Sequence, residues 1–280
     1  VDKVWEFLEG VETLELLRYE RRKARVNAAL EGLSDEEVFA EIQSRLDLAE
    51  SSPKTVKQAE LETLVASKTE LGEDKPDGTF FARTLPRQEW DVPWMAAVER
   101  VVLVHRLREV VAQVGFTRFE AAAPDLQGEL EMGVSRADLA REPTWLPAVE
   151  NRGEGFFLQF KSQAIAEWLE RDAVVKRGRK LLAGFERWQE EHPRSKRQFF
   201  GLPYVLLHSL SHLLITAVSL ECGYPASAIR ERIYALDGIG YGILLYTGTS
   251  DAEGTLGGLV QVGRKIHEHV RSALRMAELC

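Results

Sequence analysis

The chain has 280 residues, a hydrophobic content of 45% and a formal net charge of −8. This length suits one large domain or two moderate ones, and the composition is ordinary for a globular protein. The acidic total excludes a protein that coats nucleic acid through its overall charge, and two cysteines cannot form a disulfide framework. We therefore expect a protein of the reducing cytoplasm.

The charge is distributed unevenly along the chain. Residues 1–77 carry a net charge of −8, whereas residues 78–280 carry a net charge of zero. The later region can therefore present a local basic face despite the acidic total.

The N-terminal region has the pattern of a helical segment. Residues 4–30 place apolar side chains at helical spacing. Ser34, followed three residues later by Glu37, is typical of a capping box and predicts a helix over 35–49. A further helix is predicted over 54–67.

A polar stretch at 73–78, which contains proline and glycine, predicts a solvated turn. We place a domain boundary there. The expected division is a helical N-terminal region over 1–77 and a second domain over 78–280.

The second domain is predicted to mix strands and helices. A short strand is expected at 79–84, and two more within 144–160, joined by a turn at Gly153 and Gly155. Helices are expected at 94–107 and 165–189.

The last third of the chain, from residue 202 onward, has the pattern of one folded unit. It contains a long apolar helix at 202–220, a second helix at 227–234, a buried strand at 243–246 and a glycine-rich acidic loop at 248–258. The predicted fold class is therefore α+β and mainly helical. A helical N-terminal region precedes a mixed domain with a long buried helix and a small sheet.

The segment 202–220 is long enough and apolar enough to resemble a membrane span. His208, His212 and three serines interrupt it, and no aromatic belt or basic flank follows. We expect a helix of the domain core and no membrane partner.

His208 and His212 are four residues apart, so both rings emerge on one helical face. This spacing suits a divalent metal, with Asp251 or Glu253 as a third ligand, and would permit a metal-dependent hydrolase. The segment HSLSH lacks the glutamate base of a metalloprotease helix. The simpler interpretation is a pair of core histidines bonded to backbone or hydroxyl groups.

The loop at 248–258 places glycines where backbone amides could approach a ligand. It lacks the Walker A pattern, and its glycines do not follow the dinucleotide-binding order. A tight connection explains it without a ligand. Because no nucleotide-hydrolysing or nucleophile motif stands out, we do not expect an enzyme.

A basic run between residues 171 and 197 carries a net charge of +5. Flexible cations beside aromatic side chains suit phosphates and unpaired bases, although many such runs are simply solvated. The candidate nucleic-acid-binding residues are Lys176, Arg177, Arg179, Lys180, Arg194, Lys196 and Arg197.

Four segments carry a resemblance to a known family: HSLSH at 208–212, ECGY at 221–224, RERIY at 230–234 and LLYTGTSDAEGTLGGL at 244–259. They resemble a C-terminal helicase-associated domain of unknown function found in DNA-repair and phage-defence proteins. Segments 101–110, 115–118, 145–150 and 153–158 make the chain similar, more narrowly, to the DrmB family of DISARM anti-phage systems. The resemblance spans 78–280.

The resemblance implies a non-catalytic accessory subunit. Such a subunit would bind a superfamily 2 DNA helicase similar to DrmA and assist binding to DNA that is single-stranded or has unpaired ends. The matching motif residues are His208, His212, Ser250, Asp251, Gly254 and Gly257. The alternatives are the hydrolase described above and the C-terminal part of a DNA-repair helicase.

In that family, the closing helix leads into a cysteine cluster expected to bind zinc. The resemblance makes Cys280 the first ligand of such a cluster, and a single cysteine cannot hold a structural zinc. We therefore expect no cofactor or metal in this chain, zinc in a longer parent protein, and a chain that is a fragment of that parent.

Overall fold

The computed structural model describes residues 4, 7, 8, 11, 13–50, 54–118, 137–140, 144–193, 195, 197–222, 224–248 and 258–279. The chain forms two compact units that divide between Lys54 and Thr55. This division lies before the turn at 73–78, because the intervening helix and strand pack with the second unit.

The described residues of the first unit form three α-helices: α1 (Leu14–Glu20), α2 (Ala24–Ala29) and α3 (Asp35–Glu50). The predicted helix at 35–49 is confirmed, whereas the described part of 4–30 holds two short helices. The helices enclose a small core formed by Val4, Leu8, Val11, Leu17, Val26, Leu30, Val38 and Ile42.

The capping box at the start of α3 is confirmed. The Glu37 amide donates to Ser34 Oγ over 3.1 Å, and the Ser34 amide donates to Glu37 Oε2 over 2.9 Å. Arg21 closes the preceding turn by donating to the Leu30 carbonyl over 2.8 Å and by pairing with Asp35. These contacts satisfy backbone groups that a helix end leaves unpaired.

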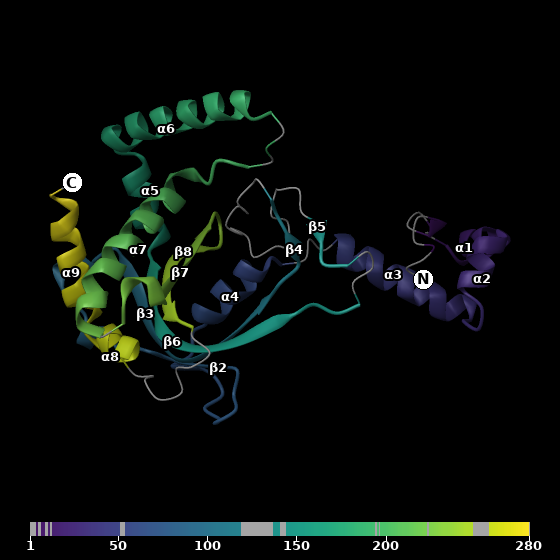
Figure 1. Ribbon diagram of the computed structural model, residues 1–280, viewed down its shortest axis with the longest axis horizontal. Coiled ribbons are helices and arrows are strands. Elements are labelled where there is room, and N and C mark those ends of the chain that lie inside the picture. Colours follow the sequence, from purple (N-terminus) through teal and green to yellow (C-terminus); the bar gives the residue numbers. More distant parts are fainter. Residues whose placement is uncertain are drawn as a thin grey trace. The chain divides into compact units, whose positions relative to one another are not determined.

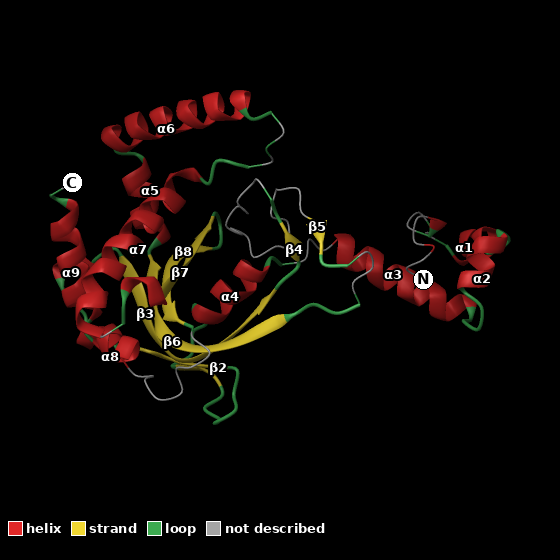
Figure 2. Ribbon diagram, viewed as in Figure 1, coloured by secondary structure: helices red, strands yellow, loops and turns green. Residues whose placement is uncertain are grey.

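The second unit is built on a six-stranded antiparallel sheet with the order β1-β2-β3-β6-β8-β7. Figures 1 and 2 show this curved sheet with helices on both of its faces. The strands are β1 (Glu70–Gly72), β2 (Phe80–Thr84), β3 (Val98–Ala112), β6 (Ala148–Phe160), β7 (Ile229–Leu236) and β8 (Gly240–Thr247). A separate pair joins β4 (Gly115–Phe116) to β5 (Ala137–Asp138).

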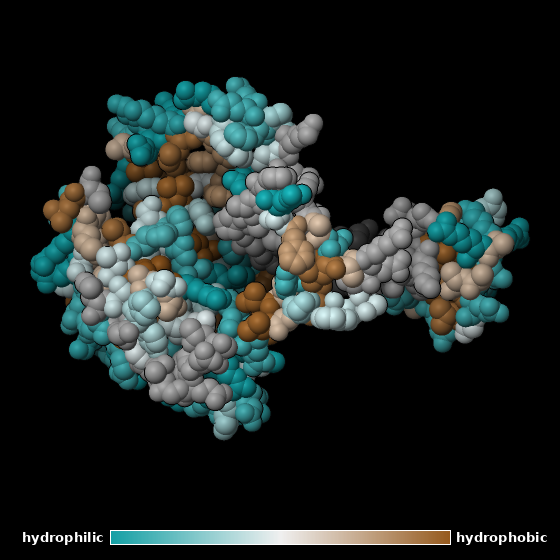
Figure 3. Space-filling model, in the orientation of Figure 1, coloured by the Kyte–Doolittle hydropathy of each residue, from teal (hydrophilic) through white to brown (hydrophobic). Residues whose placement is uncertain are grey.

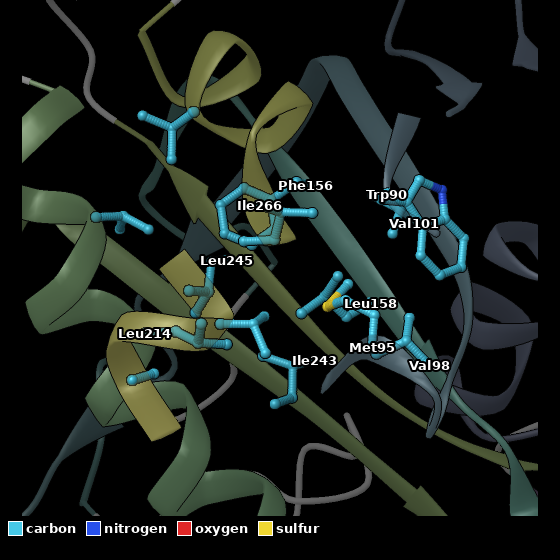
Figure 4. Packing of buried hydrophobic residues seen from close by; sticks show 14 of the residues in the cluster. Trp90, Met95, Val98, Val101, Phe156, Leu158, Leu214, Ile243, Leu245 and Ile266 are labelled. Carbon is cyan, nitrogen blue, oxygen red and sulfur yellow. The ribbon is translucent and has the colours of Figure 1, made fainter. Parts of the chain in front are cut away.

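Helices cover the two faces of the sheet unequally. Helices α7 (Gly201–Cys222), α8 (Gly258–Arg264) and α9 (Ile266–Ala277) lie over one face, while α4 (Val56–Leu64) lies on the other. The larger core lies under α7–α9, and Figure 4 shows Phe156 and Leu245 of the sheet facing Leu214 and Ile266 within it. The fold class is confirmed as a mixed α+β arrangement.

The predicted helix at 94–107 is wrong. A short 3₁₀ turn at Pro93–Met95 leads directly into strand β3. Val101 and Leu103 enter the core under α7–α9, whereas Val102 and Val104 enter the core under α4. Both faces of this strand are buried, so its apolar residues run continuously and do not alternate with polar ones.

The predicted helix at 227–234 is also wrong, because a 3₁₀ turn at Ala226–Ala228 leads into strand β7. The predicted turn within 144–160 is absent as well, and one continuous strand, β6, runs through it. Gly153 and Gly155 lie inside β6, where the buried Glu154 side chain accepts a 2.8 Å hydrogen bond from the Leu259 amide at the start of α8.

The predicted helix at 165–189 is present as two helices, α5 (Ser162–Leu169) and α6 (Asp172–Glu191). The long apolar helix is confirmed as α7. Its segment Gly201–Ser219 is the one described helix with the length and composition to cross a membrane, and 22% of its most apolar window is buried. In this structure α7 packs on β7, β8 and α9.

Candidate functional site

Helix α6 has one apolar face and one basic face. Its buried position, Gly178, lies against Leu202 at the start of α7, where an added Cβ would come within 2.6 Å of the leucine side chain. Figure 3 shows hydrophobic surface on the side of α6 that faces the helices beneath it, and hydrophilic surface on its outer side. The contact at Gly178 thus fixes which face of α6 meets solvent.

The four clustered cations lie on the solvent-exposed part of α6. With about 100° between successive residues, Lys176 and Lys180 project away from the side that holds Gly178, whereas Arg177 and Arg179 project from the two flanks of the helix. All four are exposed. Among the described residues none of them forms an ion pair, so their charge remains available to an anionic partner.

Aromatic rings accompany the C-terminal end of α6. The ring of Phe185 lies 5.8 Å from that of Trp188 and 5.9 Å from that of Phe199. The guanidinium of Arg197 lies 5.6 Å from the Trp188 ring, close enough for a cation–π contact, and His192 stacks on the same indole. Arg197 is thus near the aromatic group, while Arg194 and Lys196 lie outside the described residues.

A second group of functional side chains joins α7 to β7. His208 Nδ1 lies 2.7 Å from Oε1 of Glu231, and His212 Nε2 lies 3.6 Å from the same oxygen. The two imidazole rings meet edge to face with their centroids 4.6 Å apart. We call His208, His212 and Glu231 the His–Glu cluster.

Neighbouring side chains on α7 hold the His–Glu cluster in place. The hydroxyl of Ser211 lies within hydrogen-bond distance of two acceptors, the other carboxylate oxygen of Glu231 and the His208 carbonyl 2.7 Å away, and its single hydrogen can be donated to either. The Tyr204 ring stacks on His208 with a centroid distance of 5.6 Å. Burial, and secondarily the negative charge of Glu231, raises the pKa of Tyr204.

The interpretation of His208 and His212 as core residues bonded to backbone or hydroxyl groups is wrong. Their side chains are 42% and 63% exposed, and their close polar neighbour among the described residues is the Glu231 carboxylate. The other motif residues, Ser250, Asp251, Gly254 and Gly257, lie outside the described residues, as do Glu253 and Cys280.

Sequence reasoning missed Glu231, because the residues of RERIY favour a helix. In strand β7 the side chains alternate, so Glu231 faces α7 together with Ile229 and Ile233. The missed signal was the apolar residue at every second position that frames this glutamate.

The alternate residues of β7 face α4 and β3. Arg232 pairs with Glu60 of α4, which also accepts a 3.0 Å hydrogen bond from the Tyr234 hydroxyl. Arg230 pairs with Glu109 of β3. The charges of the RERIY segment are therefore divided between the His–Glu cluster on one face and these ion pairs on the other.

The comparison with known proteins agrees with the motifs placed above. No family model matches the chain. Over 184 residues, covering 65% of the chain, it is 38% identical to the DISARM protein DrmB of Bacillus paralicheniformis. The chain is DrmB-like. The aligned stretch is 32% of that relative's length, so the DrmB-like chain spans about a third of it.

Proposed function

We propose that this DrmB-like chain is part of an accessory subunit of a DISARM anti-phage defence system and has no catalytic role of its own. The supporting observation is the 38% identity over 184 residues to a protein named as a DISARM component. The sequence also lacks a Walker A pattern, as expected of a subunit that leaves nucleotide hydrolysis to a partner.

In this proposal the partner is a superfamily 2 DNA helicase similar to DrmA, and the chain assists its binding to DNA. The solvent-exposed part of α6 would contact phosphates through Lys176, Arg177, Arg179 and Lys180. The rings near Trp188 would stack on unpaired bases, which favours single strands or frayed ends over intact duplex.

Co-purification tests the partnership. The chain is co-expressed with the helicase encoded beside it, and the two are separated by size-exclusion chromatography at moderate salt. We expect them to elute together and to bind single-stranded DNA more tightly than either protein alone. Separate elution at every salt concentration would contradict the proposed partnership.

Charge reversal on α6 tests the DNA contact. We expect Lys176→Glu with Lys180→Glu to weaken binding to single-stranded DNA. The slope of log K against log salt should become shallower by about 1.4, because two phosphate contacts are lost and each contributes about 0.7 on a single strand. The measurement is fluorescence anisotropy over a salt series.

The matched control is Lys265→Glu with Arg275→Glu, which alters net charge equally at exposed positions near or on α9. The control should leave affinity close to that of the unaltered chain. Equal losses of DNA affinity for both double variants would mean that binding depends on the net charge of the chain and not on the cations of α6.

A further inference from the structure

The His–Glu cluster brings together the donor groups that bind divalent transition metals. Two imidazole nitrogens and a carboxylate oxygen lie within 4.8 Å of one another. Donor atoms around a tetrahedral Zn²⁺ lie about 3.3 Å apart, because each is about 2 Å from the ion. Small side-chain rotations would therefore place all three donors on one ion.

The contact between His208 and Glu231 lacks the geometry of a hydrogen bond. His208 Nδ1 is shielded from solvent and has no hydrogen-bond partner, although Glu231 Oε1 is only 2.7 Å away. The oxygen therefore lies off the direction in which a ring N–H would donate. A carboxylate oxygen this close to an imidazole nitrogen, but outside the geometry of a hydrogen bond, suits an arrangement in which both atoms bind one cation.

The surroundings of the cluster match those of a metal site that keeps an open position. Ser211 can donate to the Glu231 oxygen away from His212, which orients the carboxylate as outer-shell groups orient metal ligands. The Tyr204 ring packs on His208. The His212 side chain is 63% exposed, so a fourth ligand can approach from solvent.

We infer that His208, His212 and Glu231 bind one divalent transition-metal ion of the Zn²⁺ class. The ion joins helix α7 to strand β7 and retains one position for water or for a ligand from a partner. This site lies within the chain itself, whereas from the sequence we expected a metal only in a longer parent protein. The inference does not rest on the proposed function.

Zinc titration against a chromophoric chelator tests this site on the 280-residue chain. We expect one equivalent of Zn²⁺ to bind. His212→Ala and Glu231→Gln should weaken binding by well over tenfold, and Ser211→Ala by about tenfold, as outer-shell changes do. His192→Ala, which removes an exposed histidine just after the end of α6, should bind like the unaltered chain.

Two further readouts distinguish an ion held by the His–Glu cluster from an ion held elsewhere on the chain. Zn²⁺ should raise the melting temperature of the unaltered chain and of His192→Ala, but not that of Glu231→Gln. Bound Co²⁺ should give the visible spectrum of nitrogen and oxygen ligands, without the strong ultraviolet band of thiolates. Circular dichroism checks that each variant is folded, and His212→Ala, at an exposed position, is the variant least at risk.

The inference would be overturned by any of three results. The first is that the unaltered chain binds no Zn²⁺ at micromolar concentration. The second is that His212→Ala and Glu231→Gln, when folded, bind as tightly as the unaltered chain. The third is a thiolate band with Co²⁺, which would place the ion on Cys222 or Cys280.

Discussion

Gly153 and Gly155 lie in β6 where its backbone meets strand β8. A Cβ at position 153 would lie 1.5 Å from the Thr247 carbonyl oxygen, and one at position 155 would lie 2.1 Å from the Leu245 carbonyl oxygen. Backbone atoms of a paired strand cannot rotate aside as a flexible side chain can. Glycine is therefore required for close strand packing here and not for a turn.

Gly155→Ala should destabilise the second unit by about 3 kcal/mol, at the upper end of overpacking effects, because β6 and β8 must move apart. Urea unfolding followed by circular dichroism gives the free energy of unfolding. Gly184→Ala in α6 is the matched control, since an added Cβ there meets nothing within 4 Å. Gly184→Ala should stabilise the chain by about 0.5–1 kcal/mol. A loss of unfolding free energy similar to that of Gly155→Ala would contradict this account.

The buried tyrosines that donate to the partly buried carboxylates of Glu60 and Glu109 should stay protonated in alkali. Burial is the main cause that raises the pKa of Tyr234, followed by the charge of Glu60. Burial likewise raises the pKa of Tyr246, which donates a 2.7 Å hydrogen bond to Glu109. Each folded-state pKa lies above the unfolded value of about 10, so the contribution to stability is complete below pH 10 and is lost as the pH rises further.

Ultraviolet titration of tyrosinate checks this expectation. Between pH 10 and the onset of unfolding, Tyr234→Phe and Tyr246→Phe should leave the number of ionising tyrosines unchanged. A drop of one in that number for either variant would show that its phenol titrates freely in the folded state.

At the scale of single elements, a narrow stripe of buried side chains anchors helix α7 to the sheet. Leu207, Ser211, Leu214 and Val218 are its buried side chains among those described, and they recur at helical spacing on the side facing the sheet. Most of the other α7 side chains are partly exposed. The helix therefore covers the sheet with one face, and is less buried than its mostly apolar sequence predicts.

Leu214→Ala should cost about 2–5 kcal/mol of unfolding free energy, because it leaves a cavity between α7 and the sheet. The exposed Ser209 on the same helix gives the control: Ser209→Ala should change stability by no more than about 0.5 kcal/mol. Thermal and urea unfolding both measure the difference. Equal effects at the two positions would mean that the buried stripe does not anchor α7.

The sequence allowed some elements to be predicted and concealed others. Helix α3 was predictable because Ser34 and Glu37 mark its start, and β2 because β-type residues follow a turn. Strand β3 was not, since burial on both faces removes the alternation that identifies a strand. Strand β7 was not predictable, because Arg and Glu are common in helices and here pair with partly exposed side chains of other elements.

The candidate site also has one part that was predictable from the sequence and one part that was not. The cations of α6 lie within five residues of one another, so their clustering at one place on the helix was predictable from the sequence alone. The third member of the His–Glu cluster was not, because Glu231 reaches His208 only through the packing of α7 on β7. The alternation of apolar residues in β7 was the one local sign of the side that Glu231 faces, and it is overlooked when the segment is assigned to a helix.

At the scale of the whole molecule, each compact unit has a hydrophobic core of its own. We expect residues 55–280 to fold without residues 1–54, and the full chain to unfold in two transitions. Differential scanning calorimetry should show that one of these transitions persists at nearly the same temperature in the shorter chain. A shorter chain with no cooperative transition would mean that the units are interdependent.

Within the part of the chain that the structure describes, β1 and β7 lie at the two margins of the main sheet, each with a paired strand on one side only. Such margins invite strands from other molecules and hence aggregation. Strand β1 is only three residues long, and β7 carries the charges of Arg230, Glu231 and Arg232, while Lys57 donates to its Ile233 carbonyl. The charged residues of β7 therefore also protect the molecule from uncontrolled self-association through its backbone.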